Sequence, residues 1–404
     1  MSQPFLELSS DVQKQLNQLR ALKIAIVHDY LREYGGAERV LQQLHQLFPQ
    51  APVYVAFADP SSLGQHWPKF ADWKINQTLI SRIPGHRRLF SPLRILAPWA
   101  FSQLDLNEYD LVISSANAYF AKAVKVPNGT HVCYCHTPPR ALYGYTTLSD
   151  WKKNKVIGLL GSVLNHFLRM VDFDVAQKVD FFIANSAETA SRITKFYRRQ
   201  SKVIFPPVQS ATEILGVDKF NQLQTEKTEN PTDFYLFVNR LALAKHPELA
   251  VAACLKLKRK LVVAGVGPMQ SQLRSMVKDA GAEHLVSFLG AVDDRQLFEL
   301  YATATALIYP VEDEDFGMIP VEALSAGLPV IAHNSGGPRE TIKAGLNGVL
   351  FSDLTESGLV AALQSFNPRK FKSDIIQRTA SEFSAQKFSQ NLVTYLAELM
   401  RHKQ

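Results

Sequence analysis

Cysteine is scarce in this chain: only Cys133, Cys135 and Cys254 occur among 404 residues. Cys133 and Cys135 alternate along a predicted strand and so share one face, whereas Cys254 falls in a predicted helix. An odd and sparse set of thiols does not make a disulfide framework. We therefore expect three buried thiols and no stapled fold.

Long apolar runs are missing as well. No uninterrupted apolar stretch approaches the about 20 residues that a membrane-spanning helix needs. The first residues also lack the basic and then apolar pattern of a secretion signal. With 46% hydrophobic and 20% charged residues, the composition is that of an ordinary globular protein. These absences predict a cytoplasmic protein without a transmembrane helix.

Nucleic-acid-binding motifs are the third absence. The formal net charge of +7 favours an anionic partner of some kind. However, the sequence contains no zinc-ligand spacing, no basic-zipper heptads and no aromatic ribonucleoprotein motif. Net charge alone does not identify a nucleic-acid-binding protein, so no nucleic acid partner is expected.

What the chain does contain is a regular alternation of short apolar strands and amphipathic helices. Strands of near-continuous apolar character are typical of parallel sheets that are covered on both faces. The length suits two domains. The predicted fold class is therefore α/β, with two doubly wound Rossmann-like domains facing a central cleft. The strands are expected at residues 23–29, 53–57, 110–114, 131–135, 180–184, 234–238, 261–264, 286–289, 305–310 and 330–332.

Domain boundaries follow from a change in pattern. Residues 209–232 are polar with little apolar periodicity, which predicts a linker. The first domain would then span 1–208 and the second 233–383. The final helical stretch, 384–404, is compatible with packing back on the first domain.

The most informative motif lies between Glu314 and Glu322. A short strand ends just before it, and a helix stopped by Gly327 follows. Glu314 and the backbone N–H groups of residues 316–319 would lie at the carboxyl end of a parallel strand, where open sheets bind ligands. The next strand is followed by another glycine turn, residues 335–337, so we expect one composite nucleotide or phosphate site. The alternative is an ordinary solvated acidic loop, with Glu322 complementing the helix end.

Two further turns in the second half could contact the same ligand. Arg240 and Lys245 follow the first strand of that domain. A guanidinium fork and an ammonium group together suit a diphosphate, although two solvated surface cations remain the alternative. Gly265 and Gly267 form a turn after the next strand. This is a weak dinucleotide signal without a third glycine. We expect Gly267 chiefly to let the following helix pack closely on the sheet, and a base or ribose could lie beside it.

The first half offers a glycine turn and a histidine. Gly35 and Gly36 open a helix, where small residues let a phosphate approach backbone N–H groups; a plain tight turn is the alternative. His136 ends an apolar strand and precedes Pro138 and Pro139, which would fix its position at the mouth of the cleft. A lone histidine is nevertheless more often structural.

Taken together, these motifs resemble the retaining GT-B glycosyltransferases of family 4. The resemblance covers most of the chain: the turn 35–39, His-Thr-Pro-Pro-Arg at 136–140, residues 183–186, residues 206–208, Arg240 with Lys245, Glu314-Asp315-Phe316-Gly317 with Glu322, and residues 336–348. It implies that Arg240 and Lys245 hold the diphosphate of a sugar donor and that Glu322 binds the ribose. Glu314 and the backbone of Phe316, Gly317, Met318 and Ile319 would hold the sugar, while His136 and the turn at Gly35 and Gly36 would close the site from the other domain.

The chemistry fits these residue types. A sugar bonded to a nucleotide diphosphate already has a good leaving group, so catalysis chiefly requires neutralising the charge that grows on the departing phosphate. Arg240 and Lys245 can do this without a metal or other cofactor. The resemblance implies front-face attack with retention, in which a donor phosphate oxygen takes the acceptor's proton.

Two features depart from the family pattern. Asn239 stands where many relatives have glycine, which would narrow the space near the phosphates. Asp172-Phe173-Asp174 is similar to the metal-binding pair of a different glycosyltransferase fold. Because it precedes an amphipathic segment, 175–179, instead of closing a strand, we interpret both aspartates as acids on a helix surface, and no metal site is predicted.

Two segments interleave cations with large apolar groups, residues 79–99 and 151–160. Such composition suits docking on anionic headgroups, where each cation near the surface contributes about 1 kcal/mol. A loop packed on its own core is the alternative. The hypothesis is peripheral association with the inner face of the cell membrane and a polyprenyl-linked saccharide acceptor.

The leading functional hypothesis is transfer of a hexose from a nucleotide-diphosphate sugar to a lipid-linked or growing glycan. The motifs look most like bacterial polysaccharide mannosyltransferases, which makes GDP-mannose the first donor to test; UDP-sugars remain open. A nucleotide-sugar epimerase on the same fold is one alternative. A non-catalytic protein that binds sugar nucleotides or membranes is another.

Overall fold

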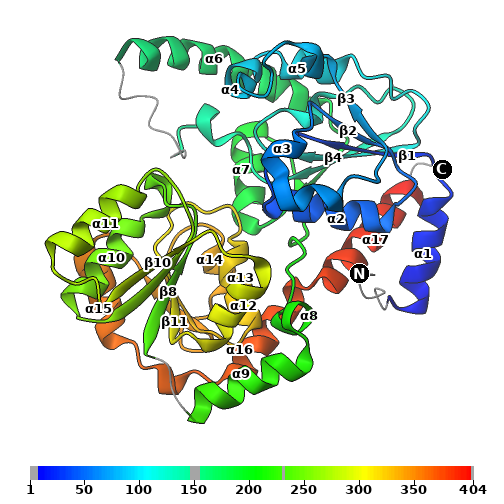
Figure 1. Cartoon of the computed structure of the whole chain (residues 1–404). Coiled ribbons are helices and arrows are strands. Elements are labelled where there is room, and N and C mark those ends of the chain that lie inside the picture. Colours follow the sequence, from blue (N-terminus) through cyan, green and yellow to red (C-terminus); the bar gives the residue numbers. More distant parts are fainter. Residues whose placement is uncertain (1–7, 146–154, 230–232, 402–404) are drawn as a thin grey trace. The chain divides into compact units, whose positions relative to one another are not determined.

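The computed structural model describes residues 8–145, 155–229 and 233–401. These residues form two compact units (Figure 1). The first combines residues 8–145, 155–207 and 385–401, and the second contains residues 208–229 and 233–384. No helix within the described ranges is both long and apolar enough to cross a membrane.

The first unit is built on a parallel seven-stranded sheet in the order β3-β2-β1-β4-β5-β6-β7. Its central strands are buried along their whole length, as near-continuous apolar sequences predict. The strands are β1 Ile24–His28, β2 Val53–Val55, β3 Ile75–Gln77, β4 Leu111–Ala116, β5 Thr130–Cys135, β6 Phe181–Ala184 and β7 Ser201–Val203.

Alternation along these strands feeds two apolar cores, one on each side of the sheet. In β1, Ile24 and Ile26 belong to one core, whereas Ala25 and Val27 belong to the other. The last helix, α17, completes the first of these cores and lies beside α1 and α2 (Figure 1). The helices of this unit are α1 Ser10–Arg20, α2 Gly36–Leu47, α3 Pro60–Leu63, α4 Phe90–Leu93, α5 Ala97–Ser102, α6 Lys155–Gln177, α7 Ala187–Tyr197 and α17 Ala385–Arg401.

The second unit repeats the architecture with a parallel six-stranded sheet in the order β10-β9-β8-β11-β12-β13. The two sheets confirm the predicted α/β class with doubly wound units. The strands are β8 Phe234–Val238, β9 Lys260–Ala264, β10 Val286–Gly290, β11 Ala306–Tyr309, β12 Val330–His333 and β13 Gly348–Phe351. The helices are α8 Ala211–Leu215, α9 Val217–Glu229, α10 Pro247–Lys256, α11 Gln270–Asp279, α12 Asp294–Thr303, α13 Met318–Ser325, α14 Pro338–Thr341, α15 Glu356–Ser365 and α16 Ser373–Ala380.

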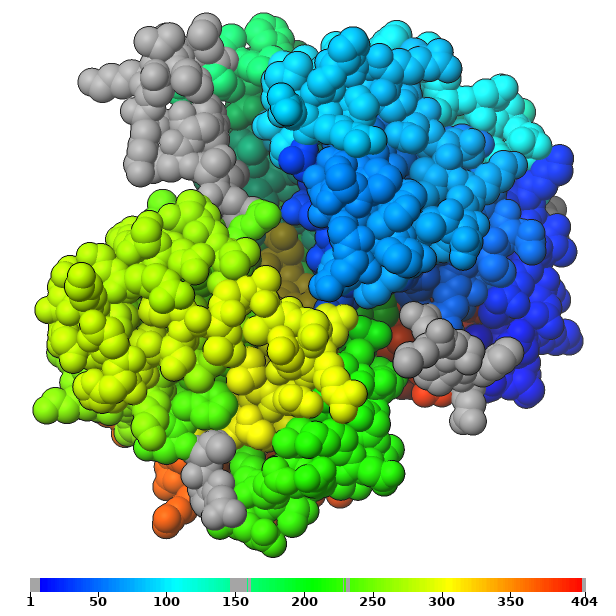
Figure 2. Space-filling model, viewed as in Figure 1, coloured from blue at the N-terminus to red at the C-terminus, as the bar shows by residue number. Residues whose placement is uncertain are grey.

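The stretch 209–232, for which the sequence predicts a linker, differs from that expectation because helices α8 and α9 occupy most of it. Phe220 and Leu223 are buried, and Gln224 donates hydrogen bonds to the carbonyls of Ala302 and Ala326. Figure 2 shows the green surface of α9 beside the yellow surface of α12, against which it packs. Because only two apolar side chains and one polar side chain hold α9 in place, the hydrophobic periodicity of its sequence is weak.

Candidate active site

In the second unit, the loops that follow β8 and β9 interlock. The N–H of Asn239 donates to Ala264 O at 3.2 Å, and the N–H of Leu241 donates to Val266 O at 3.0 Å. Gly265 has φ +136°, and a Cβ at this position would lie 1.9 Å from Asn239 O. The glycine turn predicted beside a base or ribose therefore also lets the turn that carries Arg240 pack closely.

Lys245 and Glu314, predicted from separate motifs, are in direct contact. The ammonium group of Lys245 forms a short hydrogen bond to Glu314 Oε2, and the Tyr309 hydroxyl donates to the same oxygen at 3.1 Å. The two charged side chains are 17% and 16% exposed. Burial and the Glu314 carboxylate raise the pKa of Tyr309 well above its usual value, so its hydroxyl stays a donor. Glu314 thus holds Lys245 in place and is itself held by Tyr309.

Arg240 is exposed at the turn between β8 and Lys245, and its backbone N–H donates to Asn239 Oδ1 at 2.9 Å. The amide nitrogen of Asn239 is buried and lacks a hydrogen-bond partner of good geometry among the described residues. Buried donors are normally paired in native structures. An anionic oxygen bound beside these two residues would satisfy that donor.

The turns after β11 and β12, predicted to form one composite site, touch each other. The N–H of Gly337 donates to Glu314 O at 2.8 Å. A Cβ at Gly336 would lie 2.2 Å from Glu314 O, and one at Gly337 would lie 2.2 Å from Phe316 O. Both glycines are therefore needed for the close approach that shapes the backbone around Glu314.

Helix α13 begins directly after this turn. Gly317 is its N-cap, in the left-handed region with φ +87°, and no side chain caps the helix. The first-turn N–H groups, including those of Met318 and Ile319, have no intrahelical partners, and the positive end of the helix dipole lies here. Such a terminus suits an anion or a hydroxylated ligand. Deeper in the helix, Glu322 is buried and accepts a hydrogen bond from the Tyr301 hydroxyl at 3.1 Å.

In the first unit, His136 lies just beyond the carboxyl end of β5 and is only 7% exposed. Its Nε2 is 2.8 Å from Ser115 Oγ, and its ring packs edge-on against Tyr134. Burial, and secondarily the neighbouring His28, lower the pKa of His136 to about 3. At neutral pH this side chain is therefore an uncharged imidazole.

The Gly35-Gly36 turn is linked to His136 through buried side chains. Glu38 Oε2 accepts the N–H of Gly35 at 2.8 Å, which caps α2. Glu38 Oε1 faces His28 Nε2 at 3.5 Å, and His28 Nδ1 is 3.1 Å from Ser115 Oγ. A cavity of about 210 Å³ lies beside these groups and is lined in part by Gly35, Gly36 and His28.

Three residues here were not predicted from the sequence: His28, Asp29 and Ser115. Asp29 is buried, and its carboxylate accepts the backbone N–H groups of Asn117, Tyr119 and Ala121 at 2.8 to 2.9 Å, which shapes the loop after β4. A signal existed, because all three residues stand at or next to the carboxyl ends of apolar strands. That is the same position that singled out His136.

The interpretation of Asp172 as a surface acid is wrong. Asp172 is 0% exposed, and Lys122 Nζ lies 2.5 Å from its Oδ1. The hydroxyls of Tyr143 and Tyr197 donate to its Oδ2 at 2.9 and 2.8 Å. Burial alone would lower the pKa of Lys122, but the Asp172 carboxylate raises it above its usual value, so the Lys122 ammonium keeps its charge. Asp174, in contrast, is exposed and pairs with Lys178, as expected of a helix-surface acid.

Two protein families match successive parts of the chain. The family described as Glycosyltransferase Family 4 matches residues 34–211, and the one described as Glycosyl transferases group 1 matches residues 218–378. An uncharacterized glycosyltransferase of Methanocaldococcus jannaschii is 35% identical over 136 residues, which cover 33% of this chain and 35% of that relative. The chain thus matches about a third of that relative's length.

One relative aligns over nearly its full length. The alpha-1,3/1,6-mannosyltransferase ALG2 of Candida glabrata is 23% identical across 95% of this chain and 94% of its own. Among solved structures, sucrose-phosphate synthase of Thermosynechococcus elongatus has a TM-score of 0.69 at 17% identity, covering 94% of this chain and 100% of that one. Anabaena HepE in complex with UDP has a TM-score of 0.67 at 19% identity, covering 93% and 100%. These two structures share the fold.

Proposed function

Because the chain belongs to the GT-B glycosyltransferases of the family 4 type, we propose that it transfers mannose from GDP-mannose to a lipid-linked or growing glycan. The observation that carries the proposal is the contact of Lys245 with Glu314, next to the turn of Arg240 and to the start of α13. The alignment with the mannosyltransferase ALG2 supports mannose as the sugar. HepE binds UDP and glucose, which makes a UDP-sugar the main alternative.

In the proposed reaction, Arg240 and Lys245 neutralise the charge that develops on the departing diphosphate. Glu314, which also accepts a hydrogen bond from Tyr309, holds the Lys245 ammonium in position before the donor binds, so little reorganisation is needed in the transition state. The start of α13 offers N–H groups to the sugar or the phosphates. Attack occurs on the face that the diphosphate leaves, and a phosphate oxygen takes the acceptor's proton, so the anomeric configuration is retained. The proposal needs no metal ion, because the two cations carry the positive charge.

The donor is tested by thermal unfolding with GDP, UDP, ADP and their sugar conjugates, each with magnesium and with a chelator. A ligand at about 100 times its dissociation constant stabilises the fold by about 2.7 kcal/mol. We expect stabilisation by GDP and GDP-mannose that the chelator does not change. A preference for UDP would overturn GDP-mannose as the donor. Loss of the stabilisation on adding the chelator would overturn metal independence. No stabilisation by any nucleotide would favour a non-catalytic protein. Conversion of the sugar nucleotide without any acceptor would instead indicate an epimerase.

The site itself is tested by Glu314→Ala. Losing a preorganised charged group at such a site lowers kcat by about 10²-fold. Glu356→Ala is a matched control, because Glu356 also pairs with a lysine of the same unit, Lys256, but on the exposed surface. We expect the control to keep wild-type turnover. Unchanged turnover of a folded Glu314→Ala protein would contradict the site assignment.

We also propose that an anionic membrane presents the lipid-linked acceptor to the first unit. On α6, one face is buried through Leu168, Asp172 and Val175. On the opposite face Val163, Phe167 and Met170 are 52%, 59% and 59% exposed. Residues 79–99 contribute the exposed side chains of Leu89, Ile95, Leu96 and Trp99, while Ile80 and Phe90 of the same segment pack on the core. Of the second predicted segment, 151–160, residues 151–154 lie outside the described residues.

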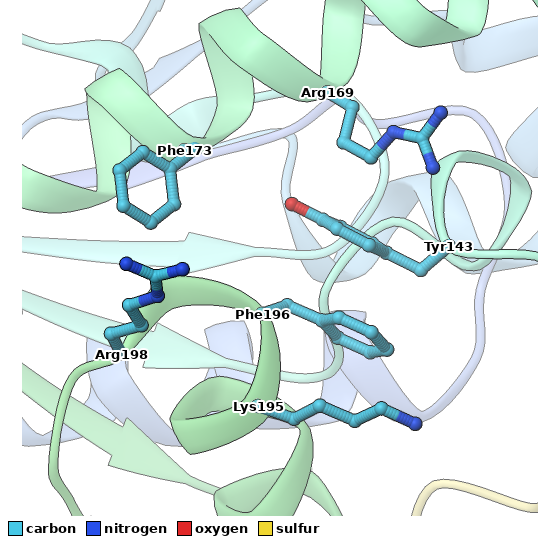
Figure 3. A pocket seen from close by; sticks show the side chains of 6 residues that line it. All are labelled: Tyr143, Arg169, Phe173, Lys195, Phe196 and Arg198. Carbon is cyan, nitrogen blue, oxygen red and sulfur yellow. The ribbon is translucent and has the colours of Figure 1, made fainter.

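A cationic pocket borders this apolar face of α6. It has a volume of about 480 Å³ and no acidic residue in its lining, which consists of Tyr143, Arg169, Phe173, Lys195, Phe196 and Arg198. Figure 3 shows the stacked rings of Tyr143 and Phe196 between Arg169 and Lys195; the ring centroids are 4.1 Å apart. Arg169, Lys195 and Arg198 form no ion pairs within the described ranges. Phosphate oxygens of a lipid headgroup match this charge, and an acyl chain matches the neighbouring apolar face.

Sedimentation with vesicles tests the membrane contact. We expect binding to anionic vesicles at low salt and little binding to zwitterionic ones. The triple variant Arg169→Glu, Lys195→Glu, Arg198→Glu should lower partitioning at least about 10²-fold, given about 1 kcal/mol for each cation. Lys256→Glu, on the second unit, is the control. Vesicle binding that the triple variant leaves unchanged would assign the contact to another surface, and no binding to anionic vesicles would contradict the membrane contact.

A further inference from the structure

The first unit contains a second cavity, of about 520 Å³, at the amino ends of its strands. Its lining includes residues that come directly or shortly before four neighbouring strands: Lys74 before β3, Pro52 before β2, Lys23 before β1 and Tyr109 before β4. Because these strands are parallel, their amino ends share one edge of the sheet. His136 follows the carboxyl end of β5, at the opposite edge. The cavity is therefore separate from the candidate active site, and its volume is typical of small-molecule sites.

The lining of this cavity is cationic. It contains Arg20, Lys23 and Lys74 against one acid, Glu108, so three positive charges and one negative charge leave a net charge of +2. Lys23 and Glu108 approach each other to 3.7 Å, but both side chains are 66% exposed, so water screens this pair. Arg20 and Lys74 form no ion pair within the part of the chain that the structure describes. An anion that enters the cavity would therefore meet an excess of positive charge.

The backbone of α2 holds one of these cations in place. Arg20 Nε donates to Leu47 O at 2.7 Å, and Arg20 Nη2 donates to Gln46 O at 3.4 Å. Both carbonyls belong to the last turn of α2, where the negative end of the helix dipole stabilises a cation. These bonds use two of the five N–H groups of the guanidinium. Arg20 is thus fixed before an anion arrives and keeps N–H groups with which to bind it.

The remaining walls are largely apolar. Phe48, Ile24 and Ala51 line the cavity and belong to one of the two cores of the first unit. Tyr109 is 8% exposed, and its hydroxyl is 2.8 Å from the hydroxyl of Tyr54. Since that hydroxyl already has a partner, Tyr109 contributes mainly the surface of its ring. A ligand must therefore carry an apolar body as well as a charge to match the lining.

We propose that this cavity binds a small organic anion in which a phosphate or carboxylate group is joined to an apolar body. The anionic group meets the cations of the lining, and the body covers the apolar walls, so water is removed from both. All twelve lining residues belong to the first unit. The proposal does not depend on the proposed function, because no residue of the lining takes part in sugar transfer.

Isothermal titration calorimetry with 1-naphthyl phosphate tests the class of ligand. We expect one-to-one binding with a dissociation constant of about 1 mM or lower. Inorganic phosphate and 1-naphthol are the two halves of this probe, and each should bind at least about tenfold more weakly because it engages only one part of the lining. Hexyl phosphate distinguishes an aliphatic from an aromatic source, since the tighter of the two amphiphiles identifies the body. No binding of either amphiphile, or equal affinity for one of the halves, would overturn the proposal.

Lys74→Glu tests the location. Lys74 is exposed beside an edge strand, so its replacement should leave the fold intact while it exchanges attraction of the phosphate for repulsion. We expect the affinity for 1-naphthyl phosphate to fall at least about tenfold. Lys202→Glu is the matched control, because Lys202 is an exposed lysine on β7, the other edge strand of the same sheet. If Lys74→Glu does not fold, Lys74→Gln replaces it, with a smaller loss expected.

The other cationic places of the molecule provide the remaining controls. Arg240→Ala alters the candidate donor site, and the triple variant of Arg169, Lys195 and Arg198 alters the pocket beside α6. Both proteins should bind 1-naphthyl phosphate as the wild type does. A loss of affinity in either of them, an equal loss in Lys202→Glu, or unchanged affinity in the Lys74 variants would place the anion elsewhere and overturn the proposal.

Discussion

The backbone of Gly265 determines whether the turn that carries Arg240 can form. Gly265→Ala adds strain at φ +136° and places a methyl group 1.9 Å from Asn239 O. Gly265→Ala therefore combines backbone strain with a steric clash. We expect it to lower the free energy of unfolding by about 1–3 kcal/mol more than a glycine-to-alanine change that adds backbone strain but no clash. Gly345→Ala supplies that comparison, since Gly345 has φ +78° and open space around its Cβ position. Urea denaturation measures both variants. Equal losses of stability in Gly265→Ala and Gly345→Ala would show that the loops after β8 and β9 can move apart at little cost.

At this scale the sequence identified the side chains but not their partners. Lys245 and Glu314 were each predicted from a position after a strand. Their contact depends on β8 and β11 being neighbours in the sheet, which the order of residues does not reveal. His28 and Ser115 were missed because a single polar residue at the end of an apolar strand is common. Such a residue is recognised as part of a site only when the structure shows that the ends of three such strands lie side by side.

At the scale of elements, the buried ion pair of Lys122 and Asp172 joins α6 to the loop that follows β4. Removing one partner of such a pair leaves an uncompensated buried charge, so Lys122→Met should cost about 3–5 kcal/mol in the free energy of unfolding. The control is Lys178→Met, one residue beyond the end of α6, in the exposed pair with Asp174 of that helix; it should cost less than about 1 kcal/mol. Chemical denaturation of the two variants checks this. A small loss for Lys122→Met would mean that water or a rearranged side chain compensates Asp172.

The burial of Asp172 and the helical structure of α9 both differ from expectation, and for the same reason. Asp172 and α9 were both judged from composition, which assigns acids to surfaces and polar stretches to linkers. In the structure, Asp172 is buried because Lys122 and two tyrosines satisfy it, and α9 is held by Phe220, Leu223 and Gln224. Compensation between distant residues is a tertiary property. It leaves no local pattern in the chain.

At the scale of the whole molecule, the fold class was accessible from the sequence and the strand order was not. Parallel strands that are buried on both faces must be apolar throughout, and this pattern recurs in both halves. Short edge strands are the exception. Residues 75–77 of β3 and 201–203 of β7 carry polar and half-exposed positions, so neither was predicted. The edge strand β13 was also missed, whereas the edge strand β10 was predicted, so a position at the edge of a sheet weakens the apolar pattern without always removing it.

Stability of the first unit should depend on pH through two buried histidines. Burial lowers the pKa of His131 to about 4 and that of His136 to about 3, whereas the unfolded chain has the ordinary value near 6.5. Between these values the unfolded state binds more protons, so the free energy of unfolding rises with pH. The contribution is complete above about pH 6.5 and is lost as the pH falls toward 4, at about 1.4 kcal/mol per pH unit for each histidine.

Urea denaturation at a series of pH values between 5 and 8 tests this expectation. His131→Gln removes one titrating group, so between pH 5 and 6 its slope should be shallower than the wild-type slope by about 1.4 kcal/mol per pH unit. Ser114→Ala, which removes the hydroxyl beside His131 but keeps the imidazole, should retain the wild-type slope. Equal slopes for the wild type and His131→Gln would mean that the His131 ring titrates alike in the folded and unfolded states. In that case burial would not be excluding its charge, and the neutral state argued for His136 by the same physics would lose its support.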